Sequence, residues 1–313
     1  MNTGMTIDGH DAYTTWGVRL LAGSLGSVVC WPQLKEASVP VNRWQEVPGL
    51  DADLSAPRLD TRKVTLKLAT DGGYIGWRRF VAAVSVHGER TVLFQALGKS
   101  FRLRPVQWGT YDYGERLGFV TLTLADDHPL DNYTYVMPIV AENGDFPYQL
   151  PFVLGGTLAD GEYAMDGRPL NRYGVHLLDG TLDGIWSAGE ARQPLVRNLP
   201  HVDGVSAYSV LDTRYNAPTM VLTALLRADN SADMWARWYA LLYDLVRPGY
   251  RTLGGIAGEK ERRFYYRGCS VLEFAIDDLS GAWIKFNITV QPLDWLPVAA
   301  GDGFPYTLPI TLG

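Results

Sequence analysis

Alternation between apolar and polar residues marks several β-strands along the chain. In the first half, residues 64–68, 101–104 and 120–124 alternate with a period of two. In the second half, residues 220–226 and 283–290 do the same. This period places every second side chain on one face of a sheet. The pattern therefore predicts a mainly β chain built from antiparallel strands.

Two segments depart from the strand period and predict helices. Across residues 232–246, apolar side chains recur every three or four positions, at Met234, Trp235, Trp238, Leu241, Leu242 and Leu245. This spacing forms one apolar stripe. Ser231 is predicted to cap this helix, and Pro248 and Gly249 to end it. A shorter helix is predicted over residues 74–84 of the first half.

The two predicted helices belong to a repeat that runs through the whole chain. The motif F-P-Y-x-L-P begins at Phe146 and again at Phe304, which follows it by 158 residues. Asp8-Gly9 and Asp166-Gly167 stand at the same offset. Other matched landmarks are Leu59-Asp60-Thr61-Arg62 with Leu211-Asp212-Thr213-Arg214, and Trp77-x-x-Phe80 with Trp235-x-x-Trp238. A fixed order of matched landmarks indicates an internal duplication. We predict two copies of one module, covering residues 1–157 and 158–313.

The repeated F-P-Y-x-L-P segments are predicted to be extended arms. Each proline removes a backbone donor, so neither segment can be a central strand. Their apolar side chains alternate and need a dry partner. One interpretation is that each arm packs on its own module as a last strand. The other is that each arm docks on the following module, which for the second arm is another subunit. The predicted interface residues are Phe146, Pro147, Tyr148, Leu150, Pro151, Phe152, Phe304, Pro305, Tyr306, Leu308, Pro309 and Ile310.

Composition narrows the possible classes of protein. The chain has 313 residues, of which 47% are hydrophobic, enough for packed cores. No apolar run has the length of a membrane span, and no signal peptide precedes the first module, so assembly in a cytoplasm is expected. Cys30 and Cys269 are predicted to be buried thiols. The net charge of −6 argues against a dedicated nucleic-acid reader.

Candidate catalytic motifs are better explained as structural features. Gly98-Lys99-Ser100 resembles the end of a phosphate-binding loop, but Leu93 stands where that loop needs a glycine. Asp8-Gly9 is predicted to form a tight turn rather than part of a metal cluster. The five histidines make no zinc pattern. We therefore expect no catalytic, metal or cofactor site and no enzymatic activity, although a hydrolase with an unrecognised site stays open.

Two segments resemble a known family. The stretch TIDGHDAYTTWGVRLLAG (residues 6–23) resembles the start of siphophage distal tail proteins, and RWQEVPGLDADLS (residues 43–55) resembles a later loop of that family. The resemblance covers residues 5–130 directly. It implies the tail-tube fold, a β-sandwich or barrel with a flanking α-helix that assembles around a channel. The fold expected here is thus two tandem tail-tube-like modules. The usual second domain of the family is a different, carbohydrate-binding-like domain, and this chain departs from that.

The resemblance also implies a function and partners. It implies a structural virion protein at the tail tip, assembled in the host cytoplasm as a hexameric or trimeric ring. The expected partners are the tail tube, hub and tape-measure proteins, with no membrane, and DNA passes through the channel without specific binding. An acidic lining would repel phosphates, and residues 31–57 are expected to reach a neighbouring subunit. A two-tube-domain baseplate hub forming a pseudo-sixfold trimer and a carbohydrate-binding β-sandwich protein are the alternatives.

Overall fold

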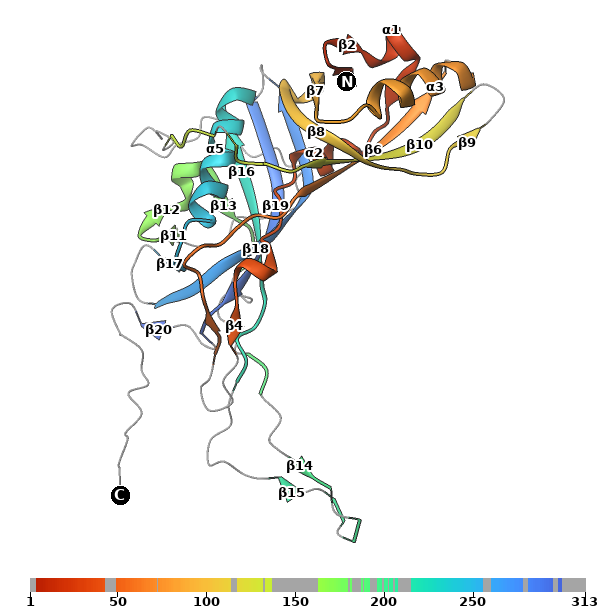
Figure 1. Cartoon of the computed structure of the whole chain (residues 1–313). Helices are drawn as coiled ribbons and strands as arrows, with labels where there is room; N and C mark the ends of the chain where they lie inside the picture. The colour runs from red at the N-terminus through yellow and green to blue at the C-terminus, as the bar shows by residue number, and fades with distance from the viewer. Residues whose placement is uncertain are drawn as a thin grey trace.

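The structure is a computed structural model of the whole chain (Figure 1). It describes residues 4–42, 49–71, 73–113, 117–131, 133–136, 163–179, 181, 187, 189–191, 196–198, 200–201, 203–204, 206–207, 215–255, 260–277, 281–294 and 298–299. The predicted mainly β character is confirmed, because two large antiparallel sheets make up most of the described chain.

The first sheet is built from residues of the first half of the chain. Its strand order is β2 (His10–Asp11), β1 (Met5–Ile7), β7 (Arg90–Phe94), β8 (Lys99–Trp108), β10 (Gly118–Asp126), β6 (Arg62–Thr70) and β3 (Val18–Leu20), and β9 (Asp112–Tyr113) pairs with β10. The strand period read from the sequence is seen directly in β6, where Val64, Leu66 and Leu68 are buried and Lys63, Thr65 and Lys67 are exposed. Three short helical segments, α1 (Ala12–Trp16), α2 (Leu25–Val29) and η2 (Gln95–Leu97), connect its strands.

The second sheet has the same strand order as the first. It runs β12 (Arg168–Pro169), β11 (Tyr163–Met165), β17 (Arg251–Gly255), β18 (Lys260–Asp277), β19 (Gly281–Pro292), β16 (Met220–Ala228) and β13 (Val175–Leu177), and β20 (Val298–Ala299) pairs with β18. The 3₁₀ turn η4 (Leu170–Tyr173) stands where α1 stands in the first half. Smaller pairs are β4 (Val41–Asn42) with β5 (Asp51–Ala52), and β14 (Val196–Arg197) with β15 (Ser206–Ala207). The turn η1 (Glu36–Ser38) precedes β4.

One long helix packs on each sheet. In the first half, α3 (Gly73–Val84) buries Trp77, Phe80 and Val84. In the second half, α5 (Ser231–Leu245) buries the predicted apolar stripe. The predicted N-cap at Ser231 was wrong. Asn230 caps α5 instead, because its extended backbone lets its side chain accept a hydrogen bond from the Asp233 N–H.

The Asp-Gly turns are fixed by the same hydrogen bonds in both halves. Asp8 and Asp166 have φ angles of 50° and 52°, in the left-handed region that Asp tolerates better than most residues. Thr91 and Thr252 each donate a backbone N–H to the turn aspartate, at 2.9 Å and 2.8 Å. Each aspartate also forms an ion pair with the arginine just before that threonine: Asp8 with Arg90, and Asp166 with Arg251. The turn interpretation is therefore confirmed.

A second set of hydrogen bonds recurs after β3 and β13. The Ser24 hydroxyl accepts from the Lys67 N–H at 2.9 Å, and the Thr181 hydroxyl accepts from the Thr223 N–H at 3.2 Å. Both hydroxyls also donate to the carbonyl of the same β6 or β16 residue. Each hydroxyl thus ties the start of a connecting segment to the neighbouring strand.

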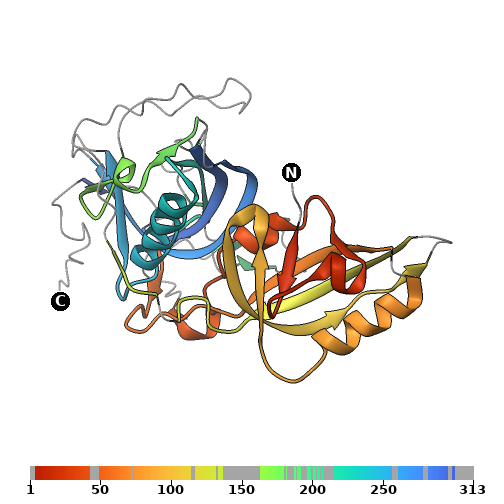
Figure 2. The same cartoon turned by 90° about the horizontal axis from the view of Figure 1, so that it is seen from above.

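The two sheets share one hydrophobic core. The buried apolar side chains form a single cluster that includes residues of both sheets and of both long helices. Seen from above, the second sheet curves around α5, and α3 lies on the far side of the first half (Figure 2). The halves are in contact head to tail, because α5 packs on the end of α2 and on the start of β8.

Candidate assembly interfaces

Trp31 belongs to the first half of the chain, but its side chain packs in the core of the second half. It follows directly after α2 and is only 3% exposed. The centroid of its ring lies 4.0 Å from that of Trp238 on α5 and 5.6 Å from that of Phe286 on β19. The Trp238 indole N–H donates to the Val29 carbonyl at 3.0 Å. Aromatic side chains contribute large buried areas at interfaces, so this contact anchors one half on the other.

The segment after Trp31 continues across the second sheet. The Tyr266 hydroxyl donates to the Pro32 carbonyl at 2.6 Å, and the Leu34 N–H donates to the Arg267 carbonyl at 2.8 Å. Glu36 pairs with Arg267 at 2.5 Å. Further on, the Leu50 N–H donates to the Leu293 carbonyl. The described part of residues 31–57, expected to reach a neighbouring subunit, thus packs on the second half of its own chain.

This crossing segment leaves a groove on the second sheet. The groove has a volume of about 1150 Å³ and is lined by Gln33, Lys35, Glu36, Asp60, Arg267 and Gln291, among others. Its lining mixes both charges, and the arginine in it is already paired with Glu36. The groove is therefore a polar space between two packed elements of the chain.

The two cysteines meet at the edge of this groove. Although far apart in the sequence, they are close enough for the Cys30 thiol to donate to the Cys269 carbonyl at 3.1 Å. Both are free and half-buried. A hydrogen bond from the Cys269 side chain lowers the pKa of Cys30, whereas burial raises the pKa of Cys269. The sequence predicted buried thiols; both cysteines are free but only half-buried, and their proximity was not predicted.

A second contact between the halves involves the start of β8. The Trp235 indole N–H on α5 donates to the Leu97 carbonyl at 3.0 Å. The Lys99 ammonium lies 4.2 Å from the ring centroid of Tyr239 and 4.8 Å from that of Trp235. Such cation–π contacts stabilise best where water is excluded. Gly98 has a φ of 58°, so Gly98-Lys99 is the turn into β8.

Lys99 is unusual because its charge is partly desolvated. Burial, together with the nearby Arg62, lowers the pKa of Lys99 from 10.5 to about 8. The side chain lines a small cavity of about 300 Å³ that also includes Glu89, Asp126 and Tyr133. The lysine is thus held at the junction by aromatic rings, and no ion pair joins it to a carboxylate in the described part of the chain.

Arg62 also stabilises the junction between the two halves through its contacts with Asp126 and Val28. Its guanidinium pairs with Asp126 at 2.6 Å and donates to the Val28 carbonyl at 2.6 Å. Arg62 is 5% exposed. Charge-assisted bonds of this kind are short and strong, and removing one partner leaves a costly buried charge. Arg62 therefore fixes the end of α2, from which Trp31 extends.

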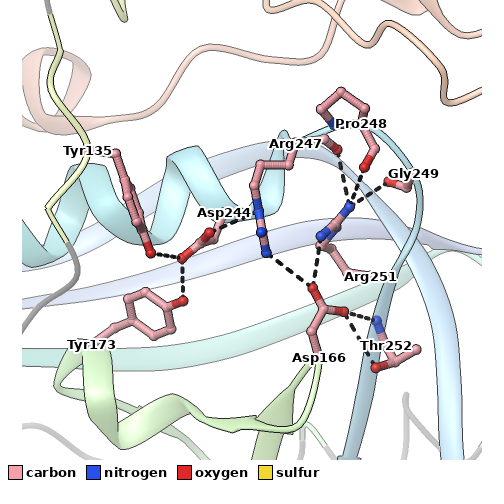
Figure 3. Close-up of polar contacts among 9 residues, drawn as sticks. All are labelled: Tyr135, Asp166, Tyr173, Asp244, Arg247, Pro248, Gly249, Arg251 and Thr252. Atoms are coloured by element: carbon pink, nitrogen blue, oxygen red, sulfur yellow. Dashed lines mark hydrogen bonds and ion pairs between the residues drawn. The ribbon is translucent and has the colours of Figure 1, made fainter.

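The segment that leaves the first half docks on α5 through tyrosines (Figure 3). The hydroxyls of Tyr135 and Tyr173 both donate to the buried Asp244 carboxylate, at 2.7 Å and 2.5 Å. Arg247 pairs with the other oxygen of Asp244 at 2.9 Å. Burial and the hydrogen bond to Asp244 raise the pKa of Tyr135 to about 12. Tyr135 also stacks on Tyr243, at 4.8 Å between ring centroids.

The same network reaches the Asp-Gly turn of the second half. Asp166 accepts bonds from Arg251 at 2.8 Å and from Arg247 at 3.5 Å (Figure 3). Arg251 also donates to the Pro248 carbonyl at 2.6 Å. Tyr135, α5 and the Asp166 turn are therefore connected by one continuous set of polar contacts.

The predicted arm residues cannot be placed at these interfaces. All twelve, from Phe146 to Phe152 and from Phe304 to Ile310, lie outside the described residues. Sequence reasoning missed Trp31, Lys99 and Tyr135, which carry the contacts between the halves. The position of Trp31 at the start of a long segment without strand period was the available signal. No comparable pattern in the sequence marks Lys99 or Tyr135.

The described part of the chain offers no obvious centre for chemistry. Among those residues, no group of three or more His, Cys, Asp or Glu side chains is arranged to hold a metal ion. No helix among them has the length and apolar character of a membrane span. The polar clusters consist of paired charges and of tyrosines bonded to carboxylates.

Comparison with known proteins finds only distant structural similarity. No protein-family model matches the chain, and no curated protein matches it. Among solved structures, one similar chain is the Dit protein of phage SPP1, described as a paradigm of the hub adsorption apparatus in phages that infect Gram-positive bacteria. The match has a TM-score of 0.29 and 10% identity, and covers 92% of this chain and 97% of that one. A TM-score this low does not establish a common fold.

Proposed function

We propose that this protein is a structural virion protein of a phage tail tip, forming a ring that lines the DNA channel and joins tail tube to baseplate. The observation that carries the proposal is the head-to-tail contact of two sheets with the same strand order within one chain. A fold that packs against a copy of itself along one direction is suited to building rings. The resemblance of residues 6–23 and 43–55 to siphophage distal tail proteins supports the same role.

We further propose that the chain consists of two copies of one tail-tube-like module, with the boundary near residue 157. The shared strand order and the repeated Asp-turn and hydroxyl contacts support this division. It favours the two-tube-domain hub, in which a trimer forms a pseudo-sixfold ring, over a hexameric ring of the distal tail protein type. The F-P-Y-x-L-P arms are proposed as additional contacts between modules or subunits.

The position of the channel surface is constrained by charge. The exposed side of the first sheet carries Lys63, Lys67, Arg102 and Arg104. The arginines are paired with Glu89 and Asp127, whereas no carboxylate among the described residues pairs with either lysine. An acidic lining would therefore have to come from another surface of the ring.

A carbohydrate-binding role has less support. Sugar-binding surfaces need exposed aromatic platforms, and none of the tryptophans within the described ranges belongs to the exposed large side chains. Tyr13, Tyr74 and Tyr250 are exposed, but they lie on different elements. We propose no catalytic, metal-binding or cofactor-binding role.

Assembly of the purified full-length chain tests the proposed function. Light scattering coupled to size exclusion is expected to give a closed trimer or hexamer, and negative-stain images are expected to show rings with a central opening. A chain that stays monomeric at micromolar concentration would overturn the proposal.

A further inference from the structure

We propose that the segment around Ala191 of one copy of this chain adds as an edge strand to β8 of a second copy, with the Ala191 N–H donating to the carbonyl of Val106. This inference rests on the proposed ring and names a contact that would close it. The proposed contact repeats, between copies, a backbone contact that joins the two halves of one chain.

The contact within one chain joins Leu34 of the first half to β18 of the second. The Leu34 N–H donates to the Arg267 carbonyl at 2.8 Å. Strand β17 pairs with β18 only as far as Phe264, so Arg267 lies where the edge of β18 is open on the β17 side. Leu34 binds this open edge from the other half. Addition of an extended segment to a sheet edge is a common mode of recognition, in which backbone hydrogen bonds supply the affinity.

Val106 occupies the corresponding place in the first sheet. Strand β7 pairs with β8 only as far as Leu103, and Val106 lies three residues beyond it, as Arg267 lies three residues beyond Phe264. Val106 and Arg267 are also the residues at which each strand bulges out of register with its neighbour, β10 or β19. Val106 is 47% exposed, and no strand in the described part of the chain pairs with it on the β7 side. An open edge of this kind favours pairing with another chain.

Ala191 presents the matching donor. It forms a β-bridge with Tyr215, as Leu34 does with Leu59. In both bridges the carbonyl just before the bridge residue accepts a backbone N–H from the partner strand, at 2.9 Å and 2.8 Å. Because backbone groups alternate in direction along an extended strand, the N–H of the bridge residue itself points away from that partner. Leu34 uses this N–H to bind Arg267, whereas Ala191 is exposed and no described residue accepts its N–H.

The side chains next to the two backbone groups are also compatible. Within the chain, Gln33 lies against Gly268, where an added Cβ would come 3.4 Å from the Gln33 Cγ. The corresponding residues between copies are Glu190, just before Ala191, and Gln107, just after Val106, and both are exposed. An amide N–H donates readily to a carboxylate. We therefore expect the Gln107 amide to donate to the Glu190 carboxylate of the second copy.

A second copy can reach the open edge of β8. Trp108, at the end of β8, packs on Trp77 and Phe80 of α3, and α3 lies on the far side of the first half (Figure 2). The junction within the chain uses the end of α2 and the start of β8 instead. The two contacts therefore do not compete for the same surface. Repetition of one head-to-tail contact generates a ring if the rotation closes.

Photo-crosslinking of the full chain tests the site on β8. With p-benzoylphenylalanine at position 106, we expect a product of twice the chain mass, with the cross-link mapped by mass spectrometry to the peptide that contains Ser187 and Ala191. The same group at Phe119, which is 46% exposed near the start of β10, is expected to give no cross-link to that peptide.

Substitution of Ala191 tests the donor. Ala191→Pro removes the N–H and places a ring on the strand edge, so it should raise the dissociation constant of the assembly about tenfold. Ala191→Gly keeps the N–H and should leave this constant unchanged. Light scattering over a concentration series measures both variants, and circular dichroism shows whether each is folded.

A charge repulsion and its rescue test the side-chain contact. Gln107→Glu places two carboxylates opposite each other, so it should weaken the assembly. Addition of Glu190→Gln to the same chain should restore the wild-type dissociation constant, because an amide again faces a carboxylate. Failure of the second substitution to restore assembly would contradict the predicted pairing of these two residues.

The outcomes separate this inference from the proposed function. Rings that form normally with folded Ala191→Pro, or cross-links from position 106 only to other regions, would overturn the edge contact and leave the ring intact. A wild-type chain that forms no assembly would overturn both. If Ala191→Pro does not fold, the cross-linking result decides, because it leaves the donor segment unchanged.

Discussion

The ring of Trp31 lies 4.0 Å from the ring of Trp238, although the two residues belong to different halves of the chain. Trp31 extends from the end of α2, which Arg62 holds in place, and Trp238 lies in the middle of α5. Because both rings are buried in the shared core, the two halves pack as one unit. The stability of each half therefore depends on its contact with the other.

Replacement of Trp31 should uncouple the two halves. Trp31→Ala removes a large buried aromatic side chain, and we expect a loss of about 3 to 5 kcal/mol in the free energy of unfolding. Calorimetry should then show two transitions where the wild type shows one. Trp108→Ala is the matched control, because Trp108 contacts Phe80 within the first half and should destabilise without separating the transitions. A single transition for Trp31→Ala would contradict the coupling.

Because Lys99 is partly buried, the free energy of unfolding should change with pH in the alkaline range. Because the pKa of Lys99 is lowered to about 8 in the folded state, folding penalises the charged form below that pH, and the penalty disappears as the pH rises towards 10.5. The unfolding free energy of the wild type should rise relative to Lys99→Met by about 1 to 2 kcal/mol across this window. Urea titrations at several pH values measure it. Lys63→Met, on the exposed face of β6, should show no such trend.

The two Asp-Gly turns should tolerate mutation unequally. Asp166→Ala removes the acceptor of the Thr252 N–H and the partner of two arginines, so we expect a loss of about 1 to 3 kcal/mol in the free energy of unfolding. Asp8→Ala should cost less, because Asp8 pairs with one arginine and is more exposed. Asp166→Asn keeps an acceptor oxygen and the left-handed backbone, and should fall between Ala and wild type. Equal losses at the two turns, from denaturant titration, would argue against this explanation.

The neighbouring thiols should react at different rates. Because the pKa of Cys30 is lowered and that of Cys269 is raised, Cys30 should be alkylated first by iodoacetamide at pH 8. Peptide mapping by mass spectrometry follows the two sites separately. In denaturant the rates should converge, and Cys269→Ala should slow the reaction of Cys30. Faster labelling of Cys269 in the folded chain would show that the pair is arranged differently.

Removal of the second arm should distinguish the two predicted roles of the F-P-Y-x-L-P segments. If the arm binds another subunit, a chain that lacks residues 303–313 should fold with unchanged melting temperature but fail to assemble. If the arm packs on its own module, the melting temperature should fall and assembly should persist. Light scattering and thermal denaturation of the truncated chain measure both. Replacement of Phe304 and Tyr306 by alanine provides the matched full-length variant.

The amino-acid sequence by itself determined the local elements and their period. The alternation in residues 64–68 and 220–226 predicted strands β6 and β16, because a half-buried strand must alternate wherever it lies. The apolar stripe of residues 234–245 predicted α5 for the equivalent reason in a helix. The Asp-Gly pairs predicted the two turns, since few other residues accept that backbone conformation.

Only the tertiary structure decided how the halves meet. Cys30 and Cys269, Trp31 and Trp238, and Lys99 and Tyr239 become neighbours because one sheet packs against the helix of the other. Local periodicity carries no information about such pairs, because it reports which face of an element is buried and not which surface buries it.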